Sequence, residues 1–486
     1  MEKISKKSAI LTISNILTLA ISMIISMVFA RYRTLEENGT YAQIMLIINT
    51  VMPFVVLGIP NSITYFIGKS DSKSGRDEYI GNFYSLIFSL CIVAGVILYL
   101  ISPVIAKKYD NELIMSMRYV FLIFPLCLQL TSTISDVLVS CDKDLTLLIY
   151  RLSYSFSLLV ICVLMVWLKW SFTVYMIIYT VVLIALSIIV VLINKEKLKI
   201  RKIFCFDLHF IKKILRFSIP IGVATVVGTL SLEFDKLFIS MNFSTEELGI
   251  YSYVAKELPI VAVTNSVTSV LLPTITRMIS RGNTDNAVEL WKNSSIVTFS
   301  ITAFFACGVF TYAPQVISIL YSDRYLAGVT IFRIYALTLF LRFTYFGIFF
   351  NTTGNGKKIL FYSLFGLFSN IILNVVLFYI FGINGPAIAT VVSIYLTDCL
   401  QLIGTKKLLK IKISELMPWV SYAKLLVINV LLSVLFYYIK IISTLDVYIS
   451  ENGEAIVLAI IWAGVYFLII GKKVIYVWKT LNRTEI

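Results

Sequence analysis

The segment LSLEFDKLFIS, residues 230–240, places three ionisable side chains inside an apolar run that covers residues 217–243. Glu233 and Lys236 are three residues apart, so in a helix they are neighbours on one face and can pair. Asp235 points about 100° away from Lys236 and needs a partner elsewhere, for which Lys256 and Arg333 are candidates. The cations of such a cluster could hold an anionic group such as a diphosphate, and its acids could bind a coupling proton or Na⁺.

Other ionisable side chains lie in apolar runs at different depths. Arg342 is near the middle of the run 328–353, where a charge costs about 2.5–3.5 kcal/mol on insertion scales and therefore faces a bundle interior or a wet cavity. Arg118 is near an outer end, whereas Arg151 and Asp398 lie toward the inside and Asp136 at the inner end of its run. The candidate substrate-binding residues are Arg342, Lys236, Lys256, Arg333 and Arg31, and the candidate ion-coupling residues are Asp235, Glu233 and Glu257. Purely structural pairing of these charges is the alternative.

The composition places these charges in a membrane protein. Hydrophobic residues make up 59% of the chain, charged residues 14%, and the mean hydropathy is +0.89. A soluble domain with that composition would expose large apolar patches. A spanning helix needs about 20 apolar residues, and fourteen runs qualify, which predicts an all-α integral membrane protein. They cover residues 8–30, 41–68, 82–103, 118–140, 145–168, 171–193, 217–241, 249–276, 293–313, 328–353, 359–381, 384–404, 418–439 and 455–471.

The loops between these runs are asymmetric in charge. Of the 42 Lys and Arg residues, 28 lie on the side of the N-terminus, seven on the other side and seven inside runs. The positive-inside rule therefore predicts a multi-pass protein of the cell membrane with both termini in the cytoplasm. This bias also accounts for the net charge of +15 without nucleic acid as a partner.

A weak internal repeat divides the chain. EENGTY at 36–41 is echoed by EELGIY at 246–251, 210 residues later, and six runs separate the copies. An even number preserves orientation, so the halves are parallel repeats, and transporters of that design bind substrate between their halves. The predicted divisions are an N-terminal lobe 1–194, a basic cytoplasmic linker 195–216, a C-terminal lobe 217–404, and two further helices with a cytoplasmic tail in 405–486.

Three segments carry a family resemblance. LEENGTYAQIMLIINTVMPFVVLGIPNSITYF at 35–66, FSIPIGVATVVGTLSLEFDKLFIS followed by LGIYSYVAKELP at 217–259, and SNIILNVVLFYIFGINGPAIATVVS at 369–393 resemble helix junctions of the polysaccharide flippases. That family is part of the multidrug/oligosaccharidyl-lipid/polysaccharide exporter superfamily. The third segment holds Asn370 and Asn374, and it has Pro386 where the family more often has Ala.

The resemblance implies two six-helix lobes around a central cavity. It also implies alternating access that moves polyprenyl-diphosphate-linked oligosaccharide outward for surface polysaccharide synthesis. The partners would be membrane lipid and that lipid-linked glycan, with a polysaccharide polymerase and glycosyltransferases in the same pathway. A cation-coupled drug antiporter and a lipid II flippase of the same superfamily are the alternatives.

An enzyme is the remaining alternative, and the residues favour it least. GNGKK at 354–358 lacks the spacing of a phosphate-binding loop, and the only histidine is His209. The seven cysteines form no CxxC pair, so neither a metal site nor another cofactor is expected beyond H⁺ or Na⁺ coupling.

Overall fold

The computed structural model describes residues 2–68, 73–196, 205–256 and 258–483, and every regular element in these ranges is helical. Twelve helices among the described residues are long and apolar enough to cross a membrane. The predicted all-α membrane class is therefore confirmed, with fourteen as an approximate count. The chain forms two compact units, Met1–Gly249 and Ile250–Ile486.

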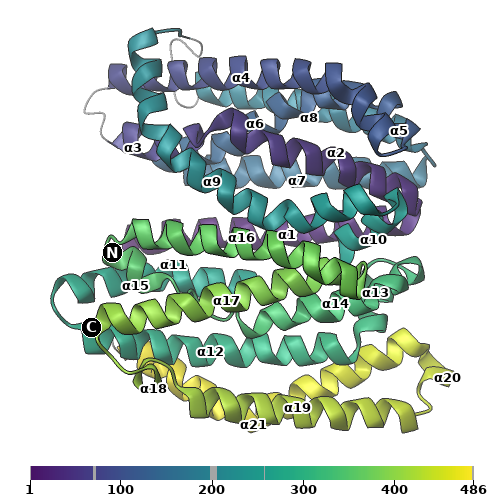
Figure 1. Ribbon diagram of the computed structural model, residues 1–486, viewed down its shortest axis with the longest axis vertical. Coiled ribbons are helices and arrows are strands. Elements are labelled where there is room, and N and C mark those ends of the chain that lie inside the picture. Colours follow the sequence, from purple (N-terminus) through teal and green to yellow (C-terminus); the bar gives the residue numbers. More distant parts are fainter. Residues whose placement is uncertain (1, 69–72, 197–204, 257, 484–486) are drawn as a thin grey trace. The chain divides into compact units, whose positions relative to one another are not determined.

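The first unit is drawn in purple to teal in Figure 1. Its long helices run alongside one another, with α4 against α6 and α1 against α7. Its elements are α1 (Glu2–Tyr32), α2 (Leu35–Val56), η1 (Ile59–Asn61), α3 (Ser62–Gly68), α4 (Lys73–Lys108), α5 (Glu112–Ser116), α6 (Arg118–Ser140), α7 (Asp144–Trp167), α8 (Phe172–Glu196), α9 (Leu208–Asn242) and the first half of α10 (Thr245–Val254).

The second unit continues from α10 to the yellow C-terminal helix (Figure 1). Helices α16 and α17 form its hairpin, and α12 lies beside both α19 and α21. Its elements are α11 (Val261–Ser280), α12 (Thr284–Thr311), α13 (Ala313–Leu320), η2 (Asp323–Gly328), α14 (Val329–Ala336), η3 (Leu337–Phe340), α15 (Ile348–Thr352), α16 (Gly356–Phe381), α17 (Asn384–Leu409), α18 (Ile413–Leu416), α19 (Trp419–Ile442), α20 (Asp446–Ile449) and α21 (Glu451–Arg483).

Three of the fourteen predicted spans are interrupted. The run 41–68 breaks at Leu57 and Gly58, between α2 and η1, where both residues have a positive φ. The run 249–276 breaks between α10 and α11, where Pro259 supplies no backbone donor and disfavours helical geometry before it. The run 328–353 breaks at 341–347, between η3 and α15. There Phe343 packs against Phe299 with ring centroids 4.9 Å apart, and Trp291 Nε1 donates to Thr344 Oγ1 at 2.8 Å. We attribute the interruption at 341–347 to this packing, which overrides the apolar run.

The predicted linker 195–216 also differs from the structure at its edges. Helix α8 continues to Glu196 and α9 begins at Leu208, so residues 208–216 are helical. Asp207 caps α9, since its Oδ1 accepts a hydrogen bond from His209 N at 2.8 Å. Helix α9 packs within the first unit, which extends to Gly249, and the predicted division of the chain into lobes stays a prediction.

Matching helix caps support the repeat. Thr34 and Glu37 form a capping box at the start of α2, with Glu37 N donating to Thr34 Oγ1 at 3.1 Å and Thr34 N donating to Glu37 Oε2 at 3.0 Å. Ser244 and Glu247, each 210 residues later, repeat both hydrogen bonds at the start of α10, at 3.2 and 2.9 Å. The two copies of the motif therefore fold in the same way.

Glycines allow these two helix starts to cross closely. A Cβ placed on Gly39 would lie 2.7 Å from the carbonyl carbon of Thr245 and closer still to its oxygen. A Cβ on Gly249 would lie 2.7 Å from the carbonyl oxygen of Leu35. Gly39 and Gly249 are equivalent positions of the repeat, so each copy contributes one glycine to the crossing.

The C-terminal helices are joined to α12 by buried hydrogen bonds. Tyr422 of α19 shares a hydrogen bond with Ser295, and the Tyr466 hydroxyl of α21 donates to Ser300 O at 2.7 Å. Asn429 Nδ2 donates in turn to the Tyr466 hydroxyl at 3.2 Å. Helices α19 and α21 are thus packed into the core of the second unit.

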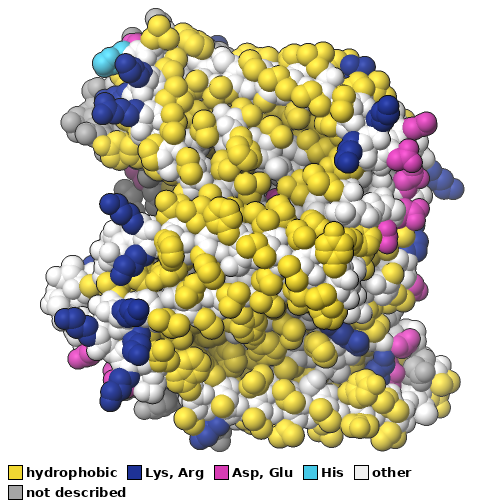
Figure 2. Space-filling view, viewed as in Figure 1, with side chains coloured by type: hydrophobic (Ala, Val, Ile, Leu, Met, Phe, Trp, Pro, Cys, Tyr) yellow, Lys and Arg dark blue, Asp and Glu magenta, His cyan; other side chains and the backbone are white. Residues whose placement is uncertain are grey.

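The surface carries the charge pattern of a membrane protein. Hydrophobic side chains cover the middle of each unit in Figure 2, and Lys and Arg lie at the helix ends on both the left and the right of the view. Most of the visible Asp and Glu side chains lie at the helix ends on the right. An apolar band between two charged ends is what a bilayer requires.

Candidate functional site

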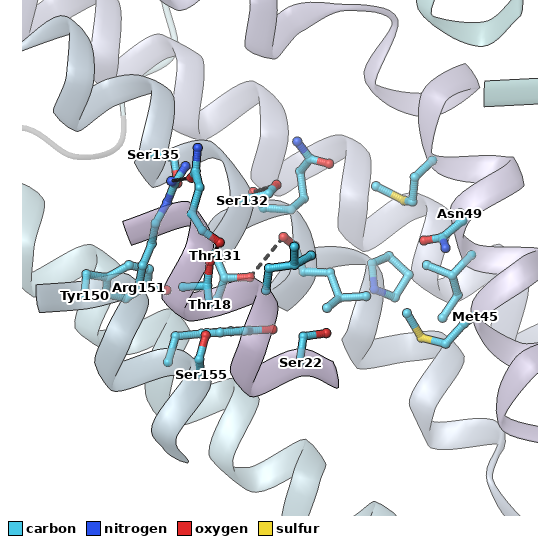
Figure 3. Close-up of a pocket in the computed structure, with 18 residues that line it drawn as sticks. Thr18, Ser22, Met45, Asn49, Thr131, Ser132, Ser135, Tyr150, Arg151 and Ser155 are labelled. Atoms are coloured by element: carbon cyan, nitrogen blue, oxygen red, sulfur yellow. Dashed lines mark hydrogen bonds between the residues drawn. The ribbon is translucent and has the colours of Figure 1, made fainter. Parts of the chain in front are cut away.

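A cavity of about 650 Å³ opens within the first unit. It lies among four helices, as Figure 3 shows, with Tyr150 and Arg151 of α7 on one side and Met45 and Asn49 of α2 on the other. Thr18 and Ser22 of α1, three residues of α6 and Ser155 of α7 complete the labelled wall. The lining is Asn15, Thr18, Leu19, Ser22, Met45, Ile48, Asn49, Met52, Pro125, Leu128, Gln129, Thr131, Ser132, Ser135, Tyr150, Arg151, Tyr154 and Ser155.

Helical periodicity explains why these residues meet. Asn15, Thr18, Leu19 and Ser22 are spaced by three and four positions, so they share one face of α1. The lining residues of α7 and α6 follow the same rule. Several hydroxyls also bond within their own helix, as Thr18 Oγ1 does to Ser14 O at 2.9 Å. A hydroxyl that donates in this way keeps its oxygen lone pairs available to a ligand.

Arg151 is the one charged side chain among the lining residues. Its Nη1 donates to Asn15 Oδ1 at 2.6 Å, and its Nε donates to Ser135 Oγ at 3.3 Å. Asp136, the next residue on α6, interacts with it electrostatically. The guanidinium of α7 is therefore held by α1 and α6 at the cavity wall.

This set of side chains suits a polar or anionic ligand. A guanidinium has five donors in a planar fork and binds phosphate in a bidentate manner. The hydroxyl and amide groups around it can bond to sugar hydroxyls, and Leu19, Met45 and Ile48 supply apolar surface. No carboxylate lines the cavity, so nothing in its lining neutralises a cationic ligand. The volume is in the range of about 300–1,000 Å³ that is typical of small-molecule sites.

The first-unit residues predicted from the sequence lie outside this lining. Lys236 Nζ and Glu233 Oε2 are 2.9 Å apart, which confirms that the two are neighbours on one helix face. Asp235 is buried, and its Oδ1 accepts a hydrogen bond from Lys236 N at 2.8 Å. Arg31 is exposed in the last turn of α1.

The second unit contains the other predicted cations. Lys256 Nζ lies 4.7 Å from the centroid of the Tyr253 ring. Arg333 Nε donates to Phe310 O at 3.1 Å. Arg342 lies in the interrupted segment 341–347, where Asp398 of α17 attracts it electrostatically. Glu257 falls outside the described residues. The pairing of Asp235 with Lys256 or Arg333 stays a prediction.

Sequence reasoning placed Arg151 toward the inner end of its span but did not select it as a site residue. The signal that could have found it is the polar face of α1, where Asn15, Thr18 and Ser22 recur at helical spacing in a span without acids. That face requires a polar partner from another helix, and Arg151 provides it. The partner helix itself could not be read from the sequence.

Comparison with known proteins identifies a family that this chain matches. The model of the family described as "Polysaccharide biosynthesis protein" matches residues 4–279, which is 276 of the 486 residues. A search of curated protein sequences found no match.

Solved structures share the fold at 15% sequence identity. A structure described as "Lipid II flippase MurJ, inward closed conformation" aligns with a TM-score of 0.75 over 94% of this chain and 98% of that chain. An inward-facing multidrug resistance MATE family transporter of the MOP superfamily aligns with a TM-score of 0.59 over 82% and 94%. A MOP superfamily transporter from Pyrococcus furiosus, described as having a binding pocket of reverse polarity, aligns with a TM-score of 0.57 over 85% and 96%.

The family match spans more than half of the chain and includes all four helices that line the cavity. It confirms the resemblance that the helix-junction motifs indicated. The chain belongs to the polysaccharide biosynthesis protein family and has the fold of the MOP superfamily transporters.

Proposed function

We propose that the protein is a flippase for polyprenyl-diphosphate-linked oligosaccharide repeat units, which it moves from the cytoplasmic to the external leaflet by alternating access. The product would supply surface polysaccharide synthesis. The observation that carries the proposal is Arg151, a single cation in an otherwise uncharged, hydroxyl-rich cavity of a polysaccharide biosynthesis family member. The guanidinium would bind the diphosphate, and the hydroxyls and amides would bind the first sugars.

Two rival functions follow from the structural neighbours. A multidrug transporter of cationic compounds would need groups that hold a positive charge. The cavity lining has two aromatic side chains, Tyr150 and Tyr154, but its one charged side chain is the cation Arg151 and it contains no carboxylate. A lipid II flippase would carry a diphosphate-linked cargo too, so Arg151 suits it equally well and the glycan must be identified by transport. We favour a flippase, which moves its cargo across the membrane without cleaving a bond, over an integral-membrane enzyme as the function of this chain.

The remaining parts of the proposal concern orientation and coupling. Both termini would be cytoplasmic in the cell membrane, on the basis of the 28-to-7 loop bias. Arg342, Lys236, Lys256, Arg333 and Arg31 remain candidate substrate contacts. Asp235, Glu233 and Glu257 remain candidates for H⁺ or Na⁺ coupling. A polysaccharide polymerase and glycosyltransferases would act before and after this step.

The test is complementation of a strain that lacks this protein and any paralogue. Loss of the protein should trap lipid-linked repeat units on the cytoplasmic face and reduce surface polymer. Wild-type protein should restore export, Arg151→Gln should not, and Arg151→Lys should restore part of it, because a point charge replaces a bidentate fork.

Lys143→Gln is the matched control, since Lys143 is an exposed cation at the N-cap of the same helix α7 and does not line the cavity. It should export normally. Unchanged surface polymer in the strain without the protein would contradict the proposal, and so would drug sensitivity as the only defect.

A further inference from the structure

Arg151 makes two hydrogen bonds of unequal length at the cavity wall. Its Nη1 donates to Asn15 Oδ1 of α1 at 2.6 Å, whereas its Nε donates to Ser135 Oγ of α6 at 3.3 Å. The usual range for such bonds is about 2.7–3.2 Å, so the second bond is long. Figure 3 shows the Arg151 side chain extending from α7 toward Ser135. Asn15 is therefore the stronger of the two contacts that fix the guanidinium.

These bonds determine which edge of the guanidinium a ligand can use. The third nitrogen, Nη2, makes no hydrogen bond with the described residues. A bidentate phosphate needs two adjacent nitrogens, so it must combine Nη2 with either Nη1 or Nε. The long bond from Nε to Ser135 gives way more easily than the short bond from Nη1 to Asn15. A phosphate would thus take the Nε–Nη2 edge, displace Ser135 and leave the bond to Asn15 in place.

Asn15 also holds the guanidinium without neutralising it. Its side chain is an uncharged amide, and no carboxylate of the described residues lies within ion-pair distance of Arg151. Lys236 shows the contrasting arrangement, since Glu233 pairs with it at 2.9 Å. A carboxylate at position 15 would occupy the fork that a phosphate uses and would cancel the positive charge.

We propose that Asn15 positions Arg151 for the cargo: its amide oxygen fixes Nη1, so the guanidinium keeps its charge and presents its Nε–Nη2 edge to one phosphate group. This inference rests on the proposed function of the Arg151 cavity. Asn15 acts on the cargo through Arg151 and is therefore a positioning residue. Helix α1 contributes no charged side chain to the lining, so its part in phosphate binding is to orient the cation of α7.

The experiment measures binding of inorganic pyrophosphate to the full-length protein in lipid nanodiscs by isothermal titration calorimetry. Asn15→Ala removes the stronger bond and should raise the Kd about tenfold, the size of one hydrogen bond to a charged group. Asn15→Asp should raise it at least about a hundredfold, because an acid bonds Arg151 more strongly but neutralises it. Asn15→Gln keeps the amide and should recover part of the affinity. A structural role alone predicts the opposite order, with Asp binding better than Ala.

Two controls isolate the effect at Arg151. Asn283→Asp makes the same exchange at the exposed N-cap of α12, outside the cavity lining, and should leave the Kd unchanged. In an Arg151→Lys background, Asn15→Ala should change the Kd less than about twofold, since an ammonium group needs no planar orientation.

The outcomes separate the positioning role from the function beneath it. Arg151→Gln should abolish binding, and wild-type binding in that variant would remove both. If Arg151→Gln loses binding but Asn15→Asp binds at least as tightly as Asn15→Ala, the positioning role is overturned and the cavity remains the phosphate site. Equal losses from Asn15→Ala in the wild-type and Arg151→Lys backgrounds would overturn it too. If Asn15→Asp does not fold, Asn15→Ala in the two backgrounds carries the test.

Discussion

Gly39→Ala should destabilise the first unit, because the added methyl group has no room where α2 and α10 cross. Its Cβ would lie 2.7 Å from the carbonyl carbon of Thr245, whereas ordinary contacts begin near 3.4 Å. The helices would have to separate by about 0.7 Å or more, and overpacking of this kind costs about 1–3 kcal/mol. The gain in helix propensity, about 1 kcal/mol, offsets part of that cost. A net loss of up to about 2 kcal/mol corresponds to a fall in Tm of up to roughly 8 °C for a unit of this size.

The assay is thermal unfolding of the purified protein in detergent, followed by size-exclusion fluorescence. Gly228→Ala is the matched control, since Gly228 lies in α9 of the same unit and a Cβ there meets nothing within 4 Å. Its Tm should be unchanged or slightly raised. Truncation of the Thr245 side chain should not rescue Gly39→Ala, because the closest atoms belong to the backbone. A Gly39→Ala protein that is as stable as Gly228→Ala would refute the close crossing.

Three further predictions address other parts of the molecule. Tyr422→Phe removes the hydrogen bond between α19 and α12 and should cost about 1 kcal/mol, which thermal unfolding will detect; wild-type stability would show that the bond contributes nothing. Arg342→Gln should reduce export more than Lys236→Gln, because Glu233 already partly neutralises Lys236; the opposite order in the complementation assay would contradict this. In a cysteine-free background, a cysteine at Tyr448 should react with an impermeant thiol reagent in intact cells and one at Lys357 should not; the reverse pattern would invert the topology.

The fold class could be predicted because hydrophobic run length and loop charge are strong local signals. Adding or removing about ten apolar residues would change whether a run is assigned as a membrane span. Most of the runs in this chain are clearly long enough. The capping boxes were also visible as Thr34 and Ser244 followed three residues later by Glu. These features depend on near neighbours in the sequence, which is why a single sequence was enough.

The interrupted span at 341–347 could not be predicted in this way. Its residues are as apolar as those of an intact helix, and the interruption coincides with contacts between Phe343 and Phe299 and between Thr344 and Trp291, which are distant in sequence. In contrast, Pro259 is a local signal for the break between α10 and α11, which the hydropathy of the run 249–276 does not reveal.

The sequence predicted what kind of residue the site would contain, an Arg inside a span, but it did not select Arg151. An Arg in a span is expected to face a bundle interior or a wet cavity, but depth along a helix does not say which helix faces it. Arg151 became the leading candidate because Asn15 and Ser135, 136 and 16 residues away, converge on it. Arg342 was favoured for its mid-span depth, and its electrostatic attraction to Asp398 could not be read from the sequence.

The most direct test of the central claim is cargo selection in proteoliposomes that contain the purified protein. Three cargoes are compared: lipid-linked repeat units extracted from the host strain, lipid II, and a cationic dye as a drug surrogate. Inner-leaflet glycolipid that reaches the outer leaflet is scored by its oxidation with an impermeant reagent. We expect rapid flipping of the lipid-linked repeat units by the wild type and by Lys143→Gln, little by Arg151→Gln, and no dye transport. Dye transport with no flipping of either glycolipid, or equal flipping by Arg151→Gln, would contradict this expectation.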